Sequence, residues 1–364
     1  MADIKKERVL SIDAARGFDM FWIIGGGELV TRLAAAFSPG AGEFVETQLK
    51  HVPWEGFRFI DLVMPLFIFL AGCSLPFSLE SRRQKGDSTA KIYRHTVQRL
   101  LILWVFGMML QGRLLELDWS RLVFYSNTLQ SIAAGTFFCT VFLLHFSKRA
   151  QLALTAGCVA LFGLLLRFAP VPEFGAGVLT PEGNFAHYVD VLVLRTLDAP
   201  AYTWVLSTLG FVATAMLGVF AGDVIRSGLP KPKVAAALAG IGAALTLAGW
   251  AGSFCVPIIK HIWNETFVLY SGGLSFLCLA LFYAVIDVLG WRRWSLAFGV
   301  IGTNAIFIYL ATHLFDLGCL SDRLVRGLQR HAAVDYPLIR AAAKFAAGYA
   351  LLVWLYRRKI FFKI

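Results

Sequence analysis

The chain has 364 residues, of which 58% are hydrophobic and only 16% are charged. Ordinary soluble domains carry about 25% charged residues, so the composition excludes a soluble enzyme, and its apolar content also excludes a disordered chain. The net charge of +11 fits basic cytoplasmic loops of a membrane protein, and we expect no nucleic-acid partner.

Ten apolar segments are long enough to cross a bilayer, because a membrane helix needs about 20 apolar residues. They predict an all-α polytopic membrane protein, with about ten transmembrane helices in one bundle that forms a single domain over residues 1–364. In chain order the segments are 18–37, 59–79, 97–115, 127–146, 150–169, 203–225, 234–254, 266–289, 295–315 and 338–356.

The distribution of Lys and Arg predicts the orientation of these spans. Basic residues gather in alternate connections, for example at 82–99 and in the tail at 357–363. Cytoplasmic loops collect such residues, so we expect both termini in the cytoplasm. Three long connections, 38–58, 170–202 and 316–337, then lie outside, and long loops are often functional. The polar N-terminal segment has no apolar signal-peptide core, which suits a bacterial inner membrane better than a lysosome.

The entry to the first span contains the first candidate site. Asp13 and Arg16 are three residues apart, a spacing that lets them pair on one helix face. Arg16 is either a boundary anchor or, if it faces a cavity, a contact for a phosphate group. Further along, three glycines precede Glu28 and permit a broken helix. Glu28 either has a partner or lines water inside the membrane, or it lies at the outer interface.

The segment around His51 is the most informative part of the sequence. His51 lies in the first outside loop, close to Trp54, and imidazole is the side chain best matched to proton transfer near neutral pH. Asp61 follows in the first turn of the second span, where it orients the His51 ring or only complements the helix dipole. A loop histidine can also be merely solvated, and both alternatives stay open at this point.

A third group of polar residues surrounds the eighth and ninth spans. Lys260, His261 and Trp263 precede the eighth span on the expected outer side. Asn304 and Tyr309 are polar groups within the ninth span, and a buried Asn needs a hydrogen-bond partner, either a neighbouring helix or a ligand. The sequence contains no phosphate-binding loop, HExxH, GxSxG or paired CxxC motif, and we expect no metal site.

These residues fall in ordered blocks that resemble the heparan-α-glucosaminide N-acetyltransferase family and its bacterial relatives. The similarity runs through nearly the whole chain and is weakest at 170–205. The blocks are Arg8-x-x-Ser11-x-Asp13-x-x-Arg16-Gly17, His51-x-x-Trp54-x-Gly56-x(4)-Asp61-Leu62-Val63-x-Pro65, Pro257-x-x-Lys260-x-x-Trp263, Ile286-Asp287-Val288-x-Gly290, Gly302-x-Asn304-x(4)-Tyr309 and the tail 356–364.

The resemblance implies an activity and a set of roles. The family's lysosomal member transfers acetyl from cytosolic acetyl-CoA across the membrane to the amine of a terminal glucosamine, and the histidine of its HxxWxG motif corresponds to His51. The histidine either carries the acetyl group or acts as a base in a ternary complex. The family also implies a cavity for CoA that opens to the cytoplasm, with Arg16 as a phosphate contact, and suggests a homodimer.

The sequence departs from the family pattern at three places. Gly25-Gly26-Gly27-Glu28 replaces an Asn-containing turn, Leu129-Gln130-Ser131 lacks the arginine of a Leu-Gln-Arg motif, and Tyr202-Thr203-Trp204 stands where an Asp-Pro-Glu-Gly segment is expected.

Our leading hypothesis is an inner-membrane acyltransferase that moves acetyl from acetyl-CoA to a sugar amine or hydroxyl on the periplasmic side. His51 acts as base or acyl acceptor, Asp61 orients it, and Asn304 and Tyr309 line the acyl path. Trp54 is a stacking surface for a sugar, and Lys260 and Trp263 shape the outer mouth. A transporter of N-acetylglucosamine or a related sugar is the alternative, and a scaffold that has lost its donor site is a third.

Overall fold

The computed structural model describes residues 9–195, 202–331 and 336–362. Within these ranges the regular structure is helical apart from one hairpin, in which β1 (Pro170–Val171) pairs antiparallel with β2 (Gly175–Ala176). The predicted all-α class is confirmed.

In this part of the chain, eight helices are long and apolar enough to cross a membrane. A ninth span results if α12 (Ser295–Thr303) and α13 (Ala305–Leu314), bent by 70°, count as one. These helices overlap the predicted spans except 97–115, of which residues 97–110 form the C-terminal part of α5 (Thr89–Leu110) and the rest lies beyond its end. That helix begins earlier and its first turns carry basic residues such as Arg94 and Arg99, which are costly within a bilayer. The structure therefore fits a polytopic membrane protein.

The chain divides into two compact units. The terminal unit comprises described residues 9–50, 58–63, 278–331 and 336–362, and the middle unit comprises 51–57, 64–195 and 202–277. The single domain and the cytoplasmic termini stay predictions.

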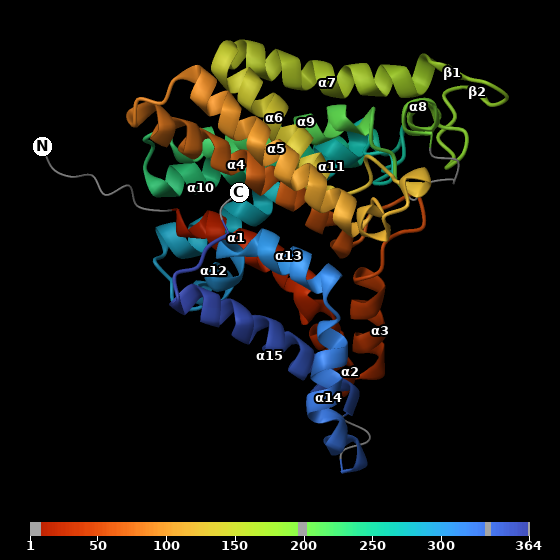
Figure 1. Cartoon of the computed structure of the whole chain (residues 1–364). Coiled ribbons are helices and arrows are strands. Elements are labelled where there is room, and N and C mark those ends of the chain that lie inside the picture. The colour runs from red at the N-terminus through yellow and green to blue at the C-terminus, as the bar shows by residue number, and fades with distance from the viewer. Residues whose placement is uncertain (1–8, 196–201, 332–335, 363–364) are drawn as a thin grey trace, which may run out of the picture. The chain divides into compact units, whose positions relative to one another are not determined.

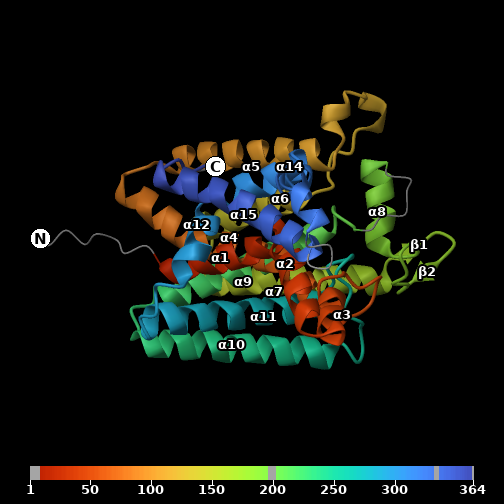
Figure 2. The same ribbon diagram turned by 90° about the horizontal axis from the view of Figure 1, so that it is seen from below.

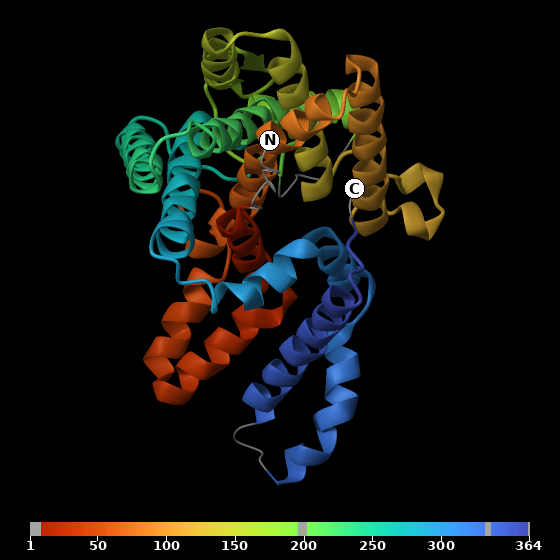
Figure 3. The same ribbon diagram turned by 90° about the vertical axis from the view of Figure 1, so that its left-hand side faces the viewer.

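The terminal unit contains helices from both ends of the chain. Figure 3 shows two hairpins of adjacent helices in this unit, α2 with α3 and α14 with α15. Besides α12 and α13, its elements are α1 (Leu10–Phe21), η1 (Trp22–Gly26), α2 (Gly27–Phe37), α3 (Pro39–Gln48), η2 (Phe59–Leu62), η5 (Ala284–Val288), α14 (Leu317–Val325), η6 (Arg326–Arg330) and α15 (Tyr336–Arg357).

Two glycines let α1 and α12 approach closely. A Cβ atom on Gly17 would lie 1.7 Å from the carbonyl oxygen of Phe298, and one on Gly302 would lie 2.1 Å from that of Asp13. Small residues at a membrane helix interface permit such backbone contact. These helices come from opposite ends of the sequence, so this glycine contact helps to join the two ends within the unit.

The glycines before Glu28 break the first span as predicted. Gly25 has φ of +109°, a conformation that glycine adopts easily, inside the π-helical turn η1. Glu28 then forms an ion pair of 3.0 Å with Lys344 of α15. The alternative in which Glu28 has a partner is therefore the one observed.

The middle unit contains most of the remaining helices, which Figure 1 shows from α4 to α11. At α4 and α11 the division between the units falls within a helix. The elements are α4 (Val63–Gln84), α5, η3 (Leu114–Glu116), η4 (Trp119–Arg121), α6 (Thr128–His145), α7 (Lys148–Phe168), β1, β2, α8 (Phe185–Leu194), α9 (Ser207–Ile225), α10 (Lys231–Gly252) and α11 (Glu265–Tyr283).

Glycines also set the helix spacing in this unit. A Cβ on Gly72 of α4 would lie 1.9 Å from the Ala215 oxygen, and one on Gly218 of α9 would lie 1.9 Å from the Phe69 oxygen. Helices α10 and α11, adjacent in Figure 2, meet in the same way, since a Cβ on Gly249 would lie 2.4 Å from the Tyr270 nitrogen. The backbones are thus packed without intervening side chains.

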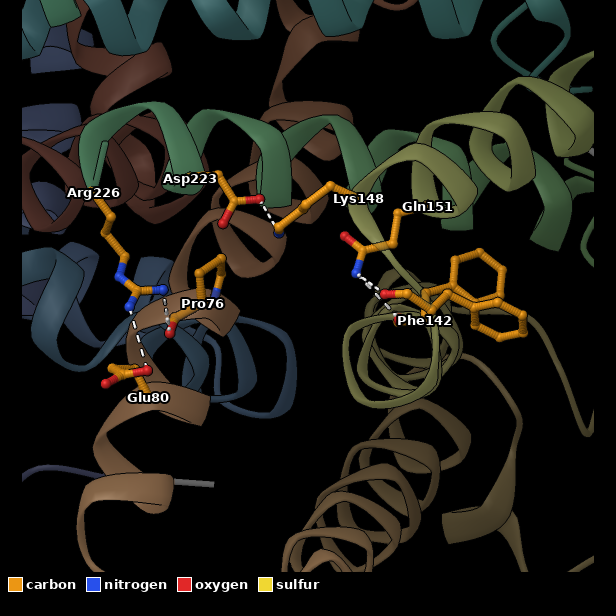
Figure 4. Close-up of polar contacts among 8 residues, drawn as sticks. Pro76, Glu80, Phe142, Lys148, Gln151, Asp223 and Arg226 are labelled. Atoms are coloured by element: carbon orange, nitrogen blue, oxygen red, sulfur yellow. Dashed lines mark hydrogen bonds and ion pairs between the residues drawn. The ribbon is translucent and has the colours of Figure 1, made fainter. Parts of the chain in front are cut away.

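Polar contacts tie together the helix ends that we expect to face the cytoplasm (Figure 4). Arg226, just after α9, donates to the Pro76 oxygen at 3.1 Å and lies 3.6 Å from Glu80 of α4. Lys148 at the start of α7 pairs with Asp223 of α9. Because each cation has a carboxylate partner, these ends are fixed relative to one another within the middle unit.

The long connection at 170–202 has more structure than its Gly- and Pro-rich sequence indicates. After the β1–β2 hairpin, the Asn184 side chain accepts a hydrogen bond of 2.8 Å from the His187 nitrogen and caps α8. Such a cap satisfies a backbone donor at the start of the helix. Residues 196–201 lie outside the described residues.

Candidate active site

The HxxWxG segment is held by backbone pairing with a distant part of the chain. Glu55 forms an antiparallel bridge with Ile259, and the Gly56 nitrogen donates to the Ile258 oxygen at 2.9 Å. Gly56 has φ of +112°, a conformation that favours glycine. The pairing brings residues 51–57 against the 257–264 turn.

The 257–264 turn is stabilised by the Asn264 side chain, which accepts from the Ile259 nitrogen at 3.2 Å and donates to the Pro257 oxygen at 2.7 Å. Trp263 has φ of +62° and is 1% exposed, and its indole nitrogen donates to Thr214 Oγ1 at 3.1 Å. A non-glycine residue in this conformation is strained and must be held by its surroundings. Trp263 therefore anchors the 257–264 turn in the core. Its predicted effect on the outer mouth of the site would be indirect, through the position of this turn.

Lys260 lies beside His51. Its Nζ is 3.2 Å from His51 Nδ1, within hydrogen-bonding distance, and 5.8 Å from the centre of the Tyr202 ring. Lys260 is 2% exposed, whereas His51 is exposed. A buried amine thus contacts the Nδ1 atom of an exposed histidine.

Three aromatic rings stack next to this pair. The His261 ring lies between Trp54, at 5.2 Å and an angle of 21°, and Tyr202, at 4.7 Å and 23°. The Trp54 indole nitrogen donates to the Leu179 oxygen at 2.8 Å, which ties the stack to the segment before α8. Since one face of the Trp54 ring is occupied by His261, any sugar stacking predicted for Trp54 has to use its other face.

Asp190 fixes the segment that carries Tyr202. Its carboxylate accepts hydrogen bonds from the backbone nitrogens of Trp204 at 2.7 Å and Val205 at 2.9 Å. Burial raises the pKa of the Asp190 carboxyl from its ordinary value to about 6, and these two N–H groups oppose the rise. The neighbouring Thr203 nitrogen donates to the His261 oxygen at 2.9 Å. Asp190 therefore stabilises the ring stack indirectly, through the backbone segment that carries Tyr202.

Asp61 belongs to the terminal unit, at the start of the second span. It is fully buried in η2, and its Oδ2 accepts a hydrogen bond of 3.0 Å from the Arg58 nitrogen. This bond caps the helix start. This contact agrees with the alternative in which Asp61 complements the start of its helix, and the orientation of His51 by Asp61 stays a prediction.

The residues predicted to contact CoA also lie in the terminal unit. Arg16 pairs with Asp13 at 3.4 Å, as their spacing predicted, and its side chain is 22% exposed. The Asn304 amide donates to the Ile360 oxygen at 3.0 Å and accepts from the Phe362 nitrogen at 2.9 Å. Tyr309 is mostly buried and its ring lies 4.4 Å from that of His313. Asn304 thus holds the C-terminal tail, and the contacts of all three with CoA stay predictions.

Across residues 9–195, 202–331 and 336–362, no group of three or more His, Cys, Asp or Glu side chains is placed to hold a metal ion.

No protein-family model matches the chain. The chain is similar to the heparan-alpha-glucosaminide N-acetyltransferase of Homo sapiens, with 24% identity over 98% of this chain and 60% of that protein. It is also similar to the Mus musculus protein of the same name, with 25% identity over 86% of this chain and 56% of the relative. The resemblance that the ordered blocks indicate is confirmed. The chain spans less than two thirds of the length of both relatives.

Sequence reasoning missed several parts of this site. The proximity of Lys260 to His51 joins residues 209 positions apart, and no local pattern encodes it. Asp190 follows a Gly- and Pro-rich stretch that obscures its helix. The only available signal was that His51 and the Lys260–Trp263 segment both fall in connections that the sequence places on the outer side.

Proposed function

We propose that this protein is a membrane-embedded acetyltransferase that moves the acetyl group of acetyl-CoA to an amino sugar or glycan. Its similarity to two proteins named as N-acetyltransferases and its eight or nine candidate spans support a transferase within a lipid bilayer. A bacterial inner membrane with the acceptor on the periplasmic side agrees with the charge pattern of the loops, and a homodimer is part of the same proposal.

The observation that carries the proposal is the 3.2 Å separation of Lys260 Nζ and His51 Nδ1. For the Nε2 atom of His51 to act as a base or nucleophile, the ring proton has to be on Nδ1. In this arrangement the Lys260 amine would accept a hydrogen bond from Nδ1–H. The lysine would thus select the reactive tautomer of His51.

Two routes are consistent with this arrangement. In the direct route the acceptor nitrogen attacks the thioester carbon, the C–N bond forms and the C–S bond breaks, and a proton moves from nitrogen to His51 Nε2 and then to the departing sulfur. In the other route Nε2 first takes the acetyl group and the Nδ1 proton moves to Lys260. The acceptor amine then takes the acetyl group and returns a proton to the ring, while Lys260 gives its proton to the CoA thiolate.

Arg16 suits a CoA phosphate, because its side chain is partly exposed and a guanidinium binds phosphate well. The comparisons do not favour the transporter alternative, since both relatives are named as transferases.

The test is acetyl transfer from labelled acetyl-CoA to glucosamine by the protein in proteoliposomes. We expect His51→Ala to lower kcat by about 10²-fold or more, and the exposed His331→Ala to leave it unchanged. Transfer by His51→Ala at the wild-type rate would overturn the role of His51, and the absence of transfer by the wild type to any amine would overturn the proposed function.

A further inference from the structure

The middle unit contains an apolar cavity of about 860 Å³ between α7, α9, α10 and α11. Its volume lies in the upper part of the range for small-molecule sites. The lining is apolar except for Thr155, Arg167 and Glu265. Along α7 the lining runs from Leu152 to Arg167, about 22 Å at 1.5 Å per residue. A cavity of this length and polarity fits a long hydrocarbon chain better than a compact polar ligand.

Two charged residues lie at one end of the cavity. Arg167 is in the last turn of α7 and Glu265 is the first residue of α11. The Glu265 Oε2 atom is buried and has no hydrogen-bond partner among the described residues. Gly163 leaves room for this carboxylate, because a Cβ there would lie 3.1 Å from Glu265 Cδ. The end that we expect on the outer side thus offers a cation and a carboxylate oxygen that has no hydrogen-bond partner among the described residues.

A second cavity of about 370 Å³ continues from this charged end, and it shares Gly163, Arg167 and Glu265 with the first. Its wall includes Leu166 and Leu179, which pack in the same hydrophobic cluster as Trp54. Leu179 also accepts the hydrogen bond of the Trp54 indole. The large cavity therefore adjoins, at its charged end, a second cavity whose wall packs against Trp54.

We propose that the acceptor is a membrane-anchored amino sugar whose hydrocarbon chain occupies the large cavity. This inference rests on the proposed function. The ammonium group of such a sugar complements Glu265, and an anionic linkage between sugar and chain complements Arg167. Anchoring holds the sugar near His51 and lowers the entropic cost of bringing it to the site.

Binding in nanodiscs tests the proposal independently of catalysis. The probe is dodecyl glucosaminide, compared with dodecyl glucoside, which has a hydroxyl in place of the amine. We expect the amine to bind about tenfold more tightly to the wild type, and Glu265→Gln to remove this preference. Equal affinity of the two probes for the wild type would show occupation by any lipid and would overturn the proposal.

Transfer kinetics give a second test with matched variants. Ala160→Phe adds bulk to the lining of the large cavity on α7. Ala243→Phe adds the same bulk at an equally exposed residue of α10 that does not line the cavity. We expect Ala160→Phe to raise KM for dodecyl glucosaminide about tenfold but not KM for methyl glucosaminide, and Ala243→Phe to change neither. Ala156→Phe is a second cavity variant if Ala160→Phe folds poorly. An unchanged KM for the dodecyl acceptor, or an equal rise for both acceptors, would overturn the proposal.

The two proposals can fail separately. Wild-type protein that acetylates no acceptor but binds the amine probe as expected would contradict only the proposed function.

Discussion

Lys260 Nζ lies 3.2 Å from His51 Nδ1, although 209 positions separate the two residues in the chain. The contact depends on backbone pairing of the HxxWxG segment with residues 258 and 259. The contact places a buried amine beside the imidazole, which is the basis of the role that we propose for Lys260.

The first prediction concerns this pair. Lys260→Met and Lys260→Arg should both lower kcat by about 10-fold or more, because neither methionine nor an always charged guanidinium accepts the Nδ1 proton. In Lys260→Met the KM for acetyl-CoA should stay unchanged, because Lys260 is proposed to act on His51 and not on the donor. Wild-type kcat in Lys260→Arg would show that a cation, and not a neutral amine, is needed.

The second prediction concerns Trp54. Trp54→Phe retains a ring to stack on His261 but loses the hydrogen bond to Leu179, so it should cost about 1 kcal/mol of stability. Trp54→Ala loses both contacts and should cost roughly 3 kcal/mol. Thermal unfolding in nanodiscs measures both, with Trp250→Phe as a control because Trp250 is 53% exposed. Equal stability of the Phe and Ala variants would contradict the importance of stacking.

The third prediction is a pH dependence of stability that Asp190 causes. Its folded-state pKa of about 6 lies above the ordinary 3.8, so protonation of Asp190 stabilises the fold. This contribution is fully present below about pH 3.8 and is lost as the pH rises through about 6. A pKa difference of about two corresponds to a free energy on the order of 3 kcal/mol.

Asp190→Asn should therefore lose this pH dependence, and the stability of the wild type relative to the variant should fall between about pH 4 and pH 7. Thermal unfolding at several pH values measures the difference. Asp118→Asn is the control. The hydrogen bonds from Ser120 lower the pKa of Asp118, so any effect there should have the opposite sign. A constant difference between wild type and Asp190→Asn would contradict the prediction.

The fourth prediction concerns the approach of α1 to α12. Gly302→Ala should destabilise the protein by about 2 kcal/mol, because the added Cβ meets the Asp13 oxygen at 2.1 Å. Gly299→Ala on the same helix meets nothing within 4 Å and should be neutral or stabilising by about 0.5 kcal/mol. Thermal unfolding of both variants in the same detergent gives the comparison. Similar unfolding temperatures would contradict the prediction, because α1 and α12 would then move apart without a loss of stability.

The sequence alone determined the features that depend on local periodicity and composition. Apolar runs of sufficient length predicted the spans that the structure contains, because the bilayer sets the length of a helix. The three-residue spacing of Asp13 and Arg16 predicted their ion pair, because such neighbours share a helix face. The ordered blocks also predicted the resemblance that the comparisons confirm.

Only the tertiary structure decided which distant polar groups meet. Sequence spacing does not show that Lys260 reaches His51, that Asn304 holds the tail at Ile360, or that Glu28 pairs with Lys344. The cavity beside Arg167 was likewise invisible, because its wall comes from four helices whose apolar residues look alike in sequence. The physical reason is that hydrophobicity specifies burial but not the partner, and the partner is set by close packing at positions such as Gly17 and Gly302.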